Sequence, residues 1–183
     1  MIRIVGGKHK GRKLFQPTSE PIRPALDRAR ESLFNVLAHS FDKPLVYGAR
    51  VLDAFAGTGA YGLEALSRGA SFCGFIDLDP GSISLVNKNI DFLGEREKTA
   101  VFKDDSTKVK SCPLPPFDLV ILAPPYGKNL VNPALESLKA QKWILENALI
   151  VAEVDAKEEY TPYPAMQVIL EKIYGRNHYY FYR

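Results

Sequence analysis

The chain of 183 residues fits one domain, since a single hydrophobic core usually serves roughly 100 to 200 residues. Its composition, 46% hydrophobic and 25% charged, excludes a disordered, collagen-like or disulfide-rich chain. The longest apolar runs fall far short of the roughly 20 residues that cross a bilayer, so we expect no membrane span. The two cysteines form no metal-ligand or disulfide pattern, and the chain opens without an apolar leader. Both features predict a cytoplasmic protein.

The net charge of +3 hides an uneven distribution of charged residues. Residues 1–50 carry ten lysines and arginines against four acids, and five of those cations fall within residues 3–13, where no acid occurs. Such a cluster is typical of a surface that neutralises phosphates, as in a nucleic acid. A solvated basic turn without a partner is the alternative that the composition leaves open.

The amino-terminal residues predict a hairpin followed by a helix. Residues 3–5 and 12–15 have the pattern of short strands on either side of a glycine-rich basic turn. Three prolines then favour an extended chain, after which apolar residues recur at helical spacing from Leu26 to Leu37. This second stretch predicts an amphipathic helix.

From residue 50 onward, strand and helix patterns alternate. The predicted strands are 51–55, 72–76, 99–102, 117–122 and 149–154, and the predicted helices are 60–68, 80–93 and 133–147. A closing hairpin is predicted from 166–174 and 178–182 around Gly175. Alternation of this kind predicts an α/β fold with a mostly parallel sheet that helices cover on both faces.

A glycine-rich turn, Gly57-Thr58-Gly59-Ala60-Tyr61-Gly62, follows the first of these strands and opens a helix. Its spacing matches the G-x-G-x-x-G pattern of dinucleotide-binding turns. Four positions before Gly57 stands Asp53, whose carboxylate would repel a pyrophosphate and attract a cation. We therefore expect S-adenosylmethionine, which carries a sulfonium and an ammonium group. A nicotinamide-dependent oxidoreductase remains an alternative that the glycine spacing alone suggests.

Polar residues also follow the next two predicted strands. Asp77 closes the second strand, where a carboxylate can accept hydrogen bonds from ribose hydroxyls, and Asp105 with Ser106 follows the third, where an adenine would lie. A helix cap or a loop charge explains any one of these acids alone. Three acids at three consecutive strand ends favour a ligand site, because ligands of such sheets bind outside the carboxyl ends of the strands.

The fourth of the alternating strands ends in Ala123-Pro124-Pro125-Tyr126. The two prolines remove amide donors and stiffen the backbone, so that its carbonyls face the cleft. Tyr126 offers a flat ring on which a base could stack, and a stiff turn with a buried tyrosine is the alternative. The three histidines share no metal-ligand spacing, so we expect no metal site.

These residues carry a family resemblance. Asp53-Ala54-Phe55-Ala56-Gly57-Thr58-Gly59, together with Pro124-Pro125-Tyr126, resembles the amino-methyltransferases that use S-adenosylmethionine. More narrowly, residues 3–13, 23–35 and 62–70 and the closing hairpin resemble the bacterial 16S ribosomal RNA guanine-N2 methyltransferase family. The likeness covers nearly the whole chain.

The resemblance implies a Rossmann-like class I methyltransferase fold, with a seven-stranded sheet and an amino-terminal β-hairpin plus helix. It implies one domain, in which residues 1–40 face RNA and residues 41–183 bind the cofactor. It also implies transfer of a methyl group from S-adenosylmethionine to the exocyclic N2 amine of a guanine in 16S ribosomal RNA, during small-subunit assembly in the cytoplasm. We expect a monomer.

The same resemblance implies roles for individual residues. The methionine end of the cofactor would contact Asp53, Phe55, Gly57 and Gly59, the ribose Asp77, and the adenine Asp105 and Ser106. The target base would lie against Pro124, Pro125 and Tyr126, next to Ala123. The RNA phosphates would meet Arg3, Lys8, Lys10, Arg12, Lys13 and Arg23.

One position departs from the family pattern. The fourth motif of the family begins with Asp or Asn, whose oxygen accepts a hydrogen bond from the amine to be methylated, and this chain has Ala123 there. Loss of such a bond commonly costs about 10²- to 10³-fold in rate. Two further hypotheses therefore stay open. One is a module that binds cofactor and RNA with little or no turnover, and the other is an amino-methyltransferase of adenine or cytosine in DNA.

Overall fold

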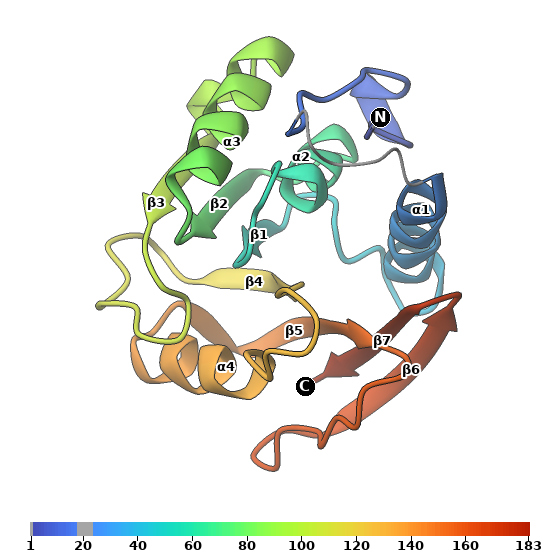
Figure 1. Ribbon diagram of the computed structural model, residues 1–183, viewed down its shortest axis with the longest axis vertical. Helices are drawn as coiled ribbons and strands as arrows, with labels where there is room; N and C mark the ends of the chain where they lie inside the picture. The colour runs from blue at the N-terminus through green and yellow to red at the C-terminus, as the bar shows by residue number, and fades with distance from the viewer. Residues whose placement is uncertain (1, 18–23) are drawn as a thin grey trace.

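The computed structural model describes residues 2–17 and 24–183. Its centre is a seven-stranded sheet in the order β3-β2-β1-β4-β5-β7-β6 (Figure 1). Strands β1 to β5 run parallel, and β7 lies antiparallel between β5 and β6. The strands are β1 (Arg50–Asp53), β2 (Phe72–Asp77), β3 (Thr99–Lys103), β4 (Phe117–Leu122), β5 (Ile144–Asp155), β6 (Val168–Tyr174) and β7 (Asn177–Tyr182). The mostly parallel sheet and the closing hairpin are confirmed.

Helices cover both faces of this sheet, as the alternating pattern predicts. Three of them, α1 (Pro24–His39), α2 (Ala60–Ser67) and α3 (Pro80–Leu93), lie on one face, and α4 (Val131–Ala140) lies on the other (Figure 1). Two 3₁₀ turns, η1 (Gly7–His9) and η2 (Arg96–Lys98), complete the elements. In the part of the chain that the structure describes, no helix is long and apolar enough to cross a membrane.

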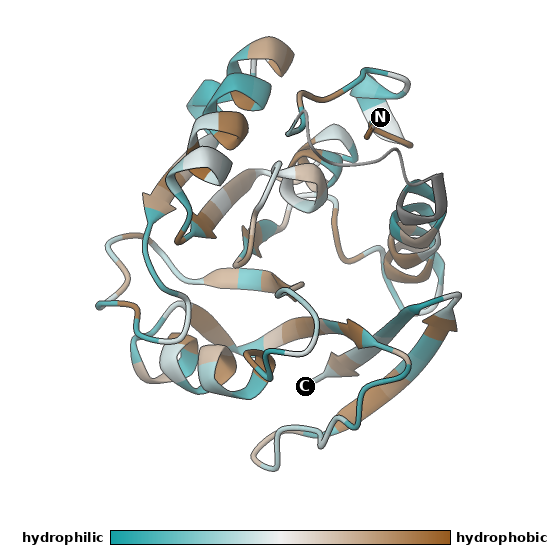
Figure 2. Ribbon diagram, in the orientation of Figure 1, coloured by the Kyte–Doolittle hydropathy of each residue, from teal (hydrophilic) through white to brown (hydrophobic). Residues whose placement is uncertain are grey.

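Two apolar cores lie on opposite faces of the sheet, because successive strand residues point to opposite sides. Val51 packs with Leu33 and Leu63 beneath α1 to α3, whereas its neighbour Leu52 packs with Leu135 and Trp143 on the α4 side. Figure 2 shows the apolar stretches along the strands. Burial on both faces explains why these strands have continuous apolar sequences.

Helix α3 has the bounds that its sequence predicts, since both ends carry strong local signals. Asp79 caps the first turn by accepting a hydrogen bond from Ser82 N over 2.7 Å, and Pro80 occupies the first helical position. Gly94 ends the helix in the left-handed region, with φ +70°.

The predicted helix 133–147 is wrong at its carboxyl end. Helix α4 ends at Ala140, and residues from Ile144 onward belong to strand β5. Lys142 turns the chain with φ +61°, and Trp143 Nε1 donates to Lys110 O over 2.7 Å. Ile144 then pairs with Phe117 of β4. Tertiary pairing therefore overrides the helical spacing of this stretch.

The amino-terminal hairpin forms with less strand structure than predicted. Its two arms share one isolated antiparallel bridge, Arg3 to Lys13, instead of two strands. The reason is that the outer amides bond to helices: Val5 N donates to Glu64 of α2, and Phe15 N donates to Asn89 of α3. The hairpin is thus attached to the helical layer as well as to itself.

Glu64 is the centre of that attachment, and its side chain is fully buried. Its Oε2 accepts from Val5 N over 2.8 Å, and its Oε1 accepts from Arg68 Nε over 2.7 Å. The guanidinium of Arg30, on α1, lies 3.7 Å from Oε2 and is itself buried. One carboxylate therefore joins the hairpin, α1 and α2.

We predict that Glu64→Ala lowers the free energy of unfolding by about 3–5 kcal/mol, because it removes the buried negative charge beside the Arg30 guanidinium and the acceptor of Val5 N and Arg68 Nε. Glu64→Gln should cost less, since the amide oxygen still accepts from Val5 N. Urea denaturation measures both. Glu136→Ala, which removes an exposed acid from α4, serves as the control. A Glu64→Ala loss no larger than that of Glu136→Ala would contradict the prediction.

Candidate active site

A cleft of about 990 Å³ opens at the carboxyl ends of the parallel strands. The segments that follow β1, β2, β3 and β4 line it, together with Glu153 of β5. It lies across the point between β1 and β4 where the strand order reverses, which is where open α/β sheets bind their ligands. Ile2, Pro17 and Arg30 also reach it, so the amino-terminal segment forms part of its wall.

Two carboxylates hold the glycine turn above the sheet. Asp77 Oδ2 accepts from Gly57 N over 2.7 Å, and Asp53 Oδ2 accepts from Gly62 N over 3.0 Å. Gly59, with φ +80°, provides the left-handed turn into α2. A Cβ on Gly62 would lie 2.3 Å from the ring of Phe75, so this glycine allows α2 to pack closely on β2.

Asp53 lies beneath this turn and has no exposed surface. Its Oδ1 has no hydrogen-bond partner among the described residues. Burial raises the pKa of Asp53 to about 7, with smaller contributions from the charges of Asp77 and Glu153, and the bond from Gly62 opposes the rise. The site thus contains a buried acceptor that lacks a donor.

The other predicted cofactor residues surround the cleft. Phe55, Gly57, Asp77, Asp105 and Ser106 line it, whereas Asp53 and Gly59 do not. Their roles toward a cofactor stay predictions, but the structure brings all of them to one end of the sheet.

Each of the polar side chains is oriented by a local contact. Asp77 Oδ1 accepts from Asp79 N over 2.9 Å, and Ser106 Oγ donates to Ala54 O. Asp105 Oδ1 accepts from the amide and the hydroxyl of Thr107, which lowers the pKa of this carboxyl group. The ionised form of Asp105 is therefore stabilised before any ligand binds.

The segment after β4 forms the opposite wall, where Ala123, Pro124, Pro125 and Tyr126 all line the cleft. The Tyr126 hydroxyl donates to Glu153 Oε1 over 2.6 Å, and burial together with the Glu153 charge raises the pKa of Tyr126. The hydrogen bond to Glu153 fixes the hydroxyl end of the Tyr126 ring. The guanidinium of Arg176 lies 5.5 Å from the centroid of the same ring.

Glu153 is a residue that sequence reasoning missed. The residue is only 5% exposed, and its carboxylate accepts from Tyr61, Tyr126 and Asn177. The only signal in the sequence is an acid inside the apolar run of β5, which predicts a strand without indicating that the acid faces a site.

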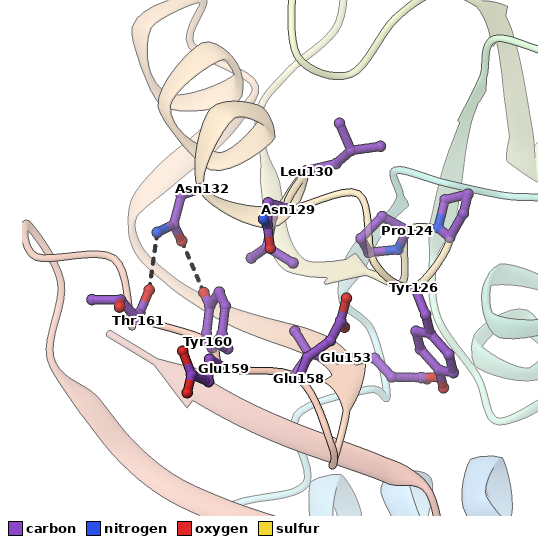
Figure 3. Close-up of a pocket in the computed structure, with 13 residues that line it drawn as sticks. Pro124, Tyr126, Asn129, Leu130, Asn132, Glu153, Glu158, Glu159, Tyr160 and Thr161 are labelled. Atoms are coloured by element: carbon purple, nitrogen blue, oxygen red, sulfur yellow. Dashed lines mark hydrogen bonds between the residues drawn. The ribbon is translucent and has the colours of Figure 1, made fainter.

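A second cavity of about 240 Å³ adjoins the cleft (Figure 3). The two cavities share Pro124, Pro125, Tyr126, Leu130 and Glu153. The far wall of the smaller cavity is residues 158–161, where Tyr160 and the Thr161 carbonyl both bond to Asn132. The stiff segment after β4 therefore lies between two hollows.

The predicted RNA-facing cations fall into three groups. Lys10 and Lys13 are exposed and form no salt bridge with any residue in the described ranges 2–17 and 24–183. Arg3 is exposed as well, 3.5 Å from Asp27. Lys8 and Arg12 make the third group, which contacts the protein. Arg23 lies outside the described residues.

Both members of the third group contact the last turn of α3 or the residues that follow it. Lys8 Nζ lies 2.6 Å from Glu95 Oε1, and His9 contacts the same oxygen at 2.5 Å. Burial opposes ionisation of Glu95, but Lys8 and His9 outweigh it and lower its pKa. Arg12 donates to Phe92 O and lies over the Phe92 ring. These contacts fasten the hairpin to α3, and the RNA contacts of its cations stay a prediction.

Asn89 is a second residue that the sequence did not single out. Its fully buried amide accepts from Phe15 N and donates to Phe15 O and to the Thr58 carbonyl in the glycine turn.

Among residues 2–17 and 24–183, no group of three or more histidine, cysteine or acidic side chains could hold a metal ion.

Comparison with known proteins agrees with this geometry. The family described as conserved hypothetical protein 95 matches residues 2–183. Ribosomal RNA small subunit methyltransferase D of Escherichia coli is 34% identical over the whole chain and 89% of its own length. The Haemophilus influenzae protein of the same name is 38% identical, over 84% of this chain and 79% of its own.

A solved structure, the Escherichia coli protein yhhF, has a TM-score of 0.81 and 32% identity, and the match covers 99% of this chain and 96% of that one. The sheet order, the glycine turn and this likeness establish the Rossmann-like fold of class I methyltransferases. The chain belongs to the conserved hypothetical protein 95 family, the family of ribosomal RNA small subunit methyltransferase D.

Proposed function

We propose that this protein transfers a methyl group from S-adenosylmethionine to the exocyclic N2 amine of a guanine in 16S ribosomal RNA, within small-subunit particles in the cytoplasm. The observation that carries the proposal is the acidic cleft at the strand-order reversal, with the Pro-Pro-Tyr segment on its other wall. Relatives of this chain are named ribosomal RNA methyltransferases, which supports the substrate class.

The charges that line the cleft fit the proposed cofactor. Five acids line it against one cation, Arg30, so the cleft favours a positive ligand and disfavours a pyrophosphate. The unpartnered Oδ1 of Asp53 supplies an acceptor close to the glycine turn. The acids are Asp77, Asp79, Asp104, Asp105 and Glu153.

In this proposal different residues of the chain contact different parts of the cofactor. Asp53, Phe55, Gly57 and Gly59 hold the methionine end, Asp77 the ribose, and Asp105 with Ser106 the adenine. The bound cofactor supplies a methyl group that its sulfonium already activates. The protein's task is therefore orientation and electrostatics, and a strong general base is not required.

The target base enters from the Pro-Pro-Tyr side. Pro124 and Pro125 stiffen the wall between the two cavities, and the oriented ring of Tyr126 offers a stacking surface. The hairpin cations engage the phosphates, and one guanine turns out of its stack. Extrusion of a base costs a few kcal/mol and is easier from a loop than from a helix, so we propose a loop target. We also propose that the enzyme is a monomer.

Ala123 favours a second candidate function. Without a polar side chain at this position, the chain would bind cofactor and RNA with little turnover. Methylation measurements separate the two.

We predict that the protein labels small ribosomal subunits that lack the modification when incubated with tritiated S-adenosylmethionine. Mass spectrometry of the digested 16S RNA should then show N2-methylguanosine. Because a carboxylate would accept the hydrogen bond of the amine, Ala123→Asp should label the subunits as well. Labelling by Ala123→Asp but not by the unchanged chain would support the module without turnover, and a methylated adenine or cytosine would contradict the guanine assignment.

We predict that cofactor affinity depends on the ionisation of Asp53. Its pKa is raised to about 7, so below this pH the carboxyl is neutral and no longer attracts a positive ligand. Affinity for S-adenosylmethionine should fall roughly fivefold between about pH 7.5 and about pH 6, measured by calorimetry.

Asp53→Asn should bind S-adenosylmethionine weakly at both pH values, and its affinity should not change between them, since an amide does not titrate in this range. Glu146→Gln, which changes an exposed acid on β5, should keep the fall in affinity between the two pH values. A fall of the same size in Asp53→Asn would assign the titration to another group.

A further inference from the structure

Position 123 and Glu153 are neighbours in the sheet. The register of the parallel pair places Leu122, the last residue of β4, opposite Ala152. Continuing this register by one residue brings Ala123, which directly follows β4, opposite Glu153. Ile121 and Val151, two positions earlier, both face the core beneath α1 to α3. Alternation along a strand therefore directs the side chains of 123 and 153 to this same face. Both residues line the large cleft.

Glu153 is a buried carboxylate that only neutral groups hold. No lysine, arginine or histidine within the described parts of the chain forms a salt bridge with it. Its donors are the hydroxyls of Tyr61 and Tyr126 and the amide of Asn177. A buried charge without a counter-ion is costly, and such groups concentrate at functional sites.

The number of donors leaves room for one more hydrogen bond. An ionised carboxylate has about four acceptor positions. Oε1 accepts from Tyr126 and Asn177, each over 2.6 Å, and Oε2 accepts from Tyr61. The Tyr179 hydroxyl also interacts with this carboxylate, but it has a single proton, which it can donate to Tyr61 instead. Figure 3 shows the carboxylate of Glu153 beside Tyr126, in the wall that the two cavities share. The free acceptor position thus belongs to a carboxylate that borders both the large cleft and the second cavity.

We propose that Glu153 is the catalytic acceptor for the target amine, in place of the side-chain oxygen that Ala123 lacks. This inference rests on the proposed function. An N–H of the amine donates to Glu153 Oε2, which orients the nitrogen lone pair toward the methyl carbon. As the N–C bond forms, the S–C bond breaks and its electron pair stays on sulfur. The proton of the methylated nitrogen passes to Glu153 and from there to solvent.

The surrounding hydroxyls keep the carboxylate in position for this step. Burial and the Glu153 charge raise the pKa of Tyr61 and of Tyr126, so both stay protonated and continue to donate. Tyr179 in turn bonds to the Tyr61 hydroxyl over 3.1 Å. The network therefore positions Glu153 through neutral donors.

The first test is Glu153→Gln in the full chain, assayed with unmethylated small subunits. We expect kcat to fall by about 10²- to 10³-fold, the usual effect of losing a charged hydrogen bond at a reacting centre. Affinity for S-adenosylhomocysteine, measured by calorimetry, and KM for the subunits should stay within about threefold, because neither depends on this bond. Glu146→Gln, at the other end of β5, is the matched control and should keep full activity.

The second test moves the carboxylate back to the neighbouring strand. Adding Ala123→Asp to Glu153→Gln should restore kcat by about tenfold or more, since the two side chains face the same pocket. A purely structural role of Glu153 would not respond to an acid at position 123. Either a kcat of Glu153→Gln within about threefold of the unchanged chain, or no rescue by Ala123→Asp, overturns the proposal.

Two further outcomes keep the test decisive. If Glu153→Gln does not fold, Glu153→Asp takes its place. This variant keeps the carboxylate but shortens the side chain, so its kcat should fall about tenfold or more. An unchanged kcat overturns the proposal. If neither the unchanged chain nor Ala123→Asp labels the subunits, the proposed function itself fails. Labelling by Ala123→Asp but not by the unchanged chain supports the module without turnover, and it rejects the role of Glu153 as well. Labelling by the unchanged chain together with an unaffected kcat of Glu153→Gln rejects only the role of Glu153.

Discussion

The architecture of the cleft depends on two carboxylates that bond to the backbone of one glycine turn. Asp53 and Asp77 end adjacent parallel strands, and each accepts an amide N–H of the turn that follows β1. The bonds define the path of the loop and bring negative charge to its base. The same constraint that shapes the turn therefore places the Asp77 carboxylate in the wall of the cleft and buries that of Asp53, whose pKa is raised by this burial.

The amino-terminal segment is connected to this turn through buried polar side chains. Glu64 joins the hairpin to α1 and α2, and Asn89 bonds both to Phe15 and to the Thr58 carbonyl in the glycine turn. Each buried group is satisfied only while the hairpin stays in place, apart from the unbonded Nε of Arg30. The basic amino-terminal segment is thus packed into the same body as the cleft, and it also supplies part of the cleft wall.

The opposite wall of the cleft combines a stiff backbone segment after β4 with one acidic side chain, Glu153. Pro124 and Pro125 limit the backbone, while Glu153 and its neutral donors hold Tyr126 between two cavities. The family resemblance implies a polar side chain at position 123, where this chain has alanine, and an acid on β5, Glu153, lines the same cleft. Parallel pairing explains how this is possible, because side chains at equivalent positions of adjacent strands face the same pocket.

The sequence by itself determined much of this protein. The alternating apolar runs predicted the sheet and its helices, and the bounds of α3 and β4 agree with the structure because caps, glycines and a continuous apolar strand are local signals. The glycine turn, the acids after the strands and the Pro-Pro-Tyr segment were also visible, and the structure brings them to one end of the sheet.

Only the tertiary structure decided which of these groups contact one another. The end of α4 depends on pairing between Ile144 and Phe117, and the single bridge of the hairpin depends on amides that bond to Glu64 and Asn89 instead. Lys8 pairs with Glu95, and Glu153 faces the cleft, through contacts between residues distant in the chain. Spacing in a sequence reports the periodicity of one element, whereas burial and pairing of a polar side chain depend on which other elements pack against it.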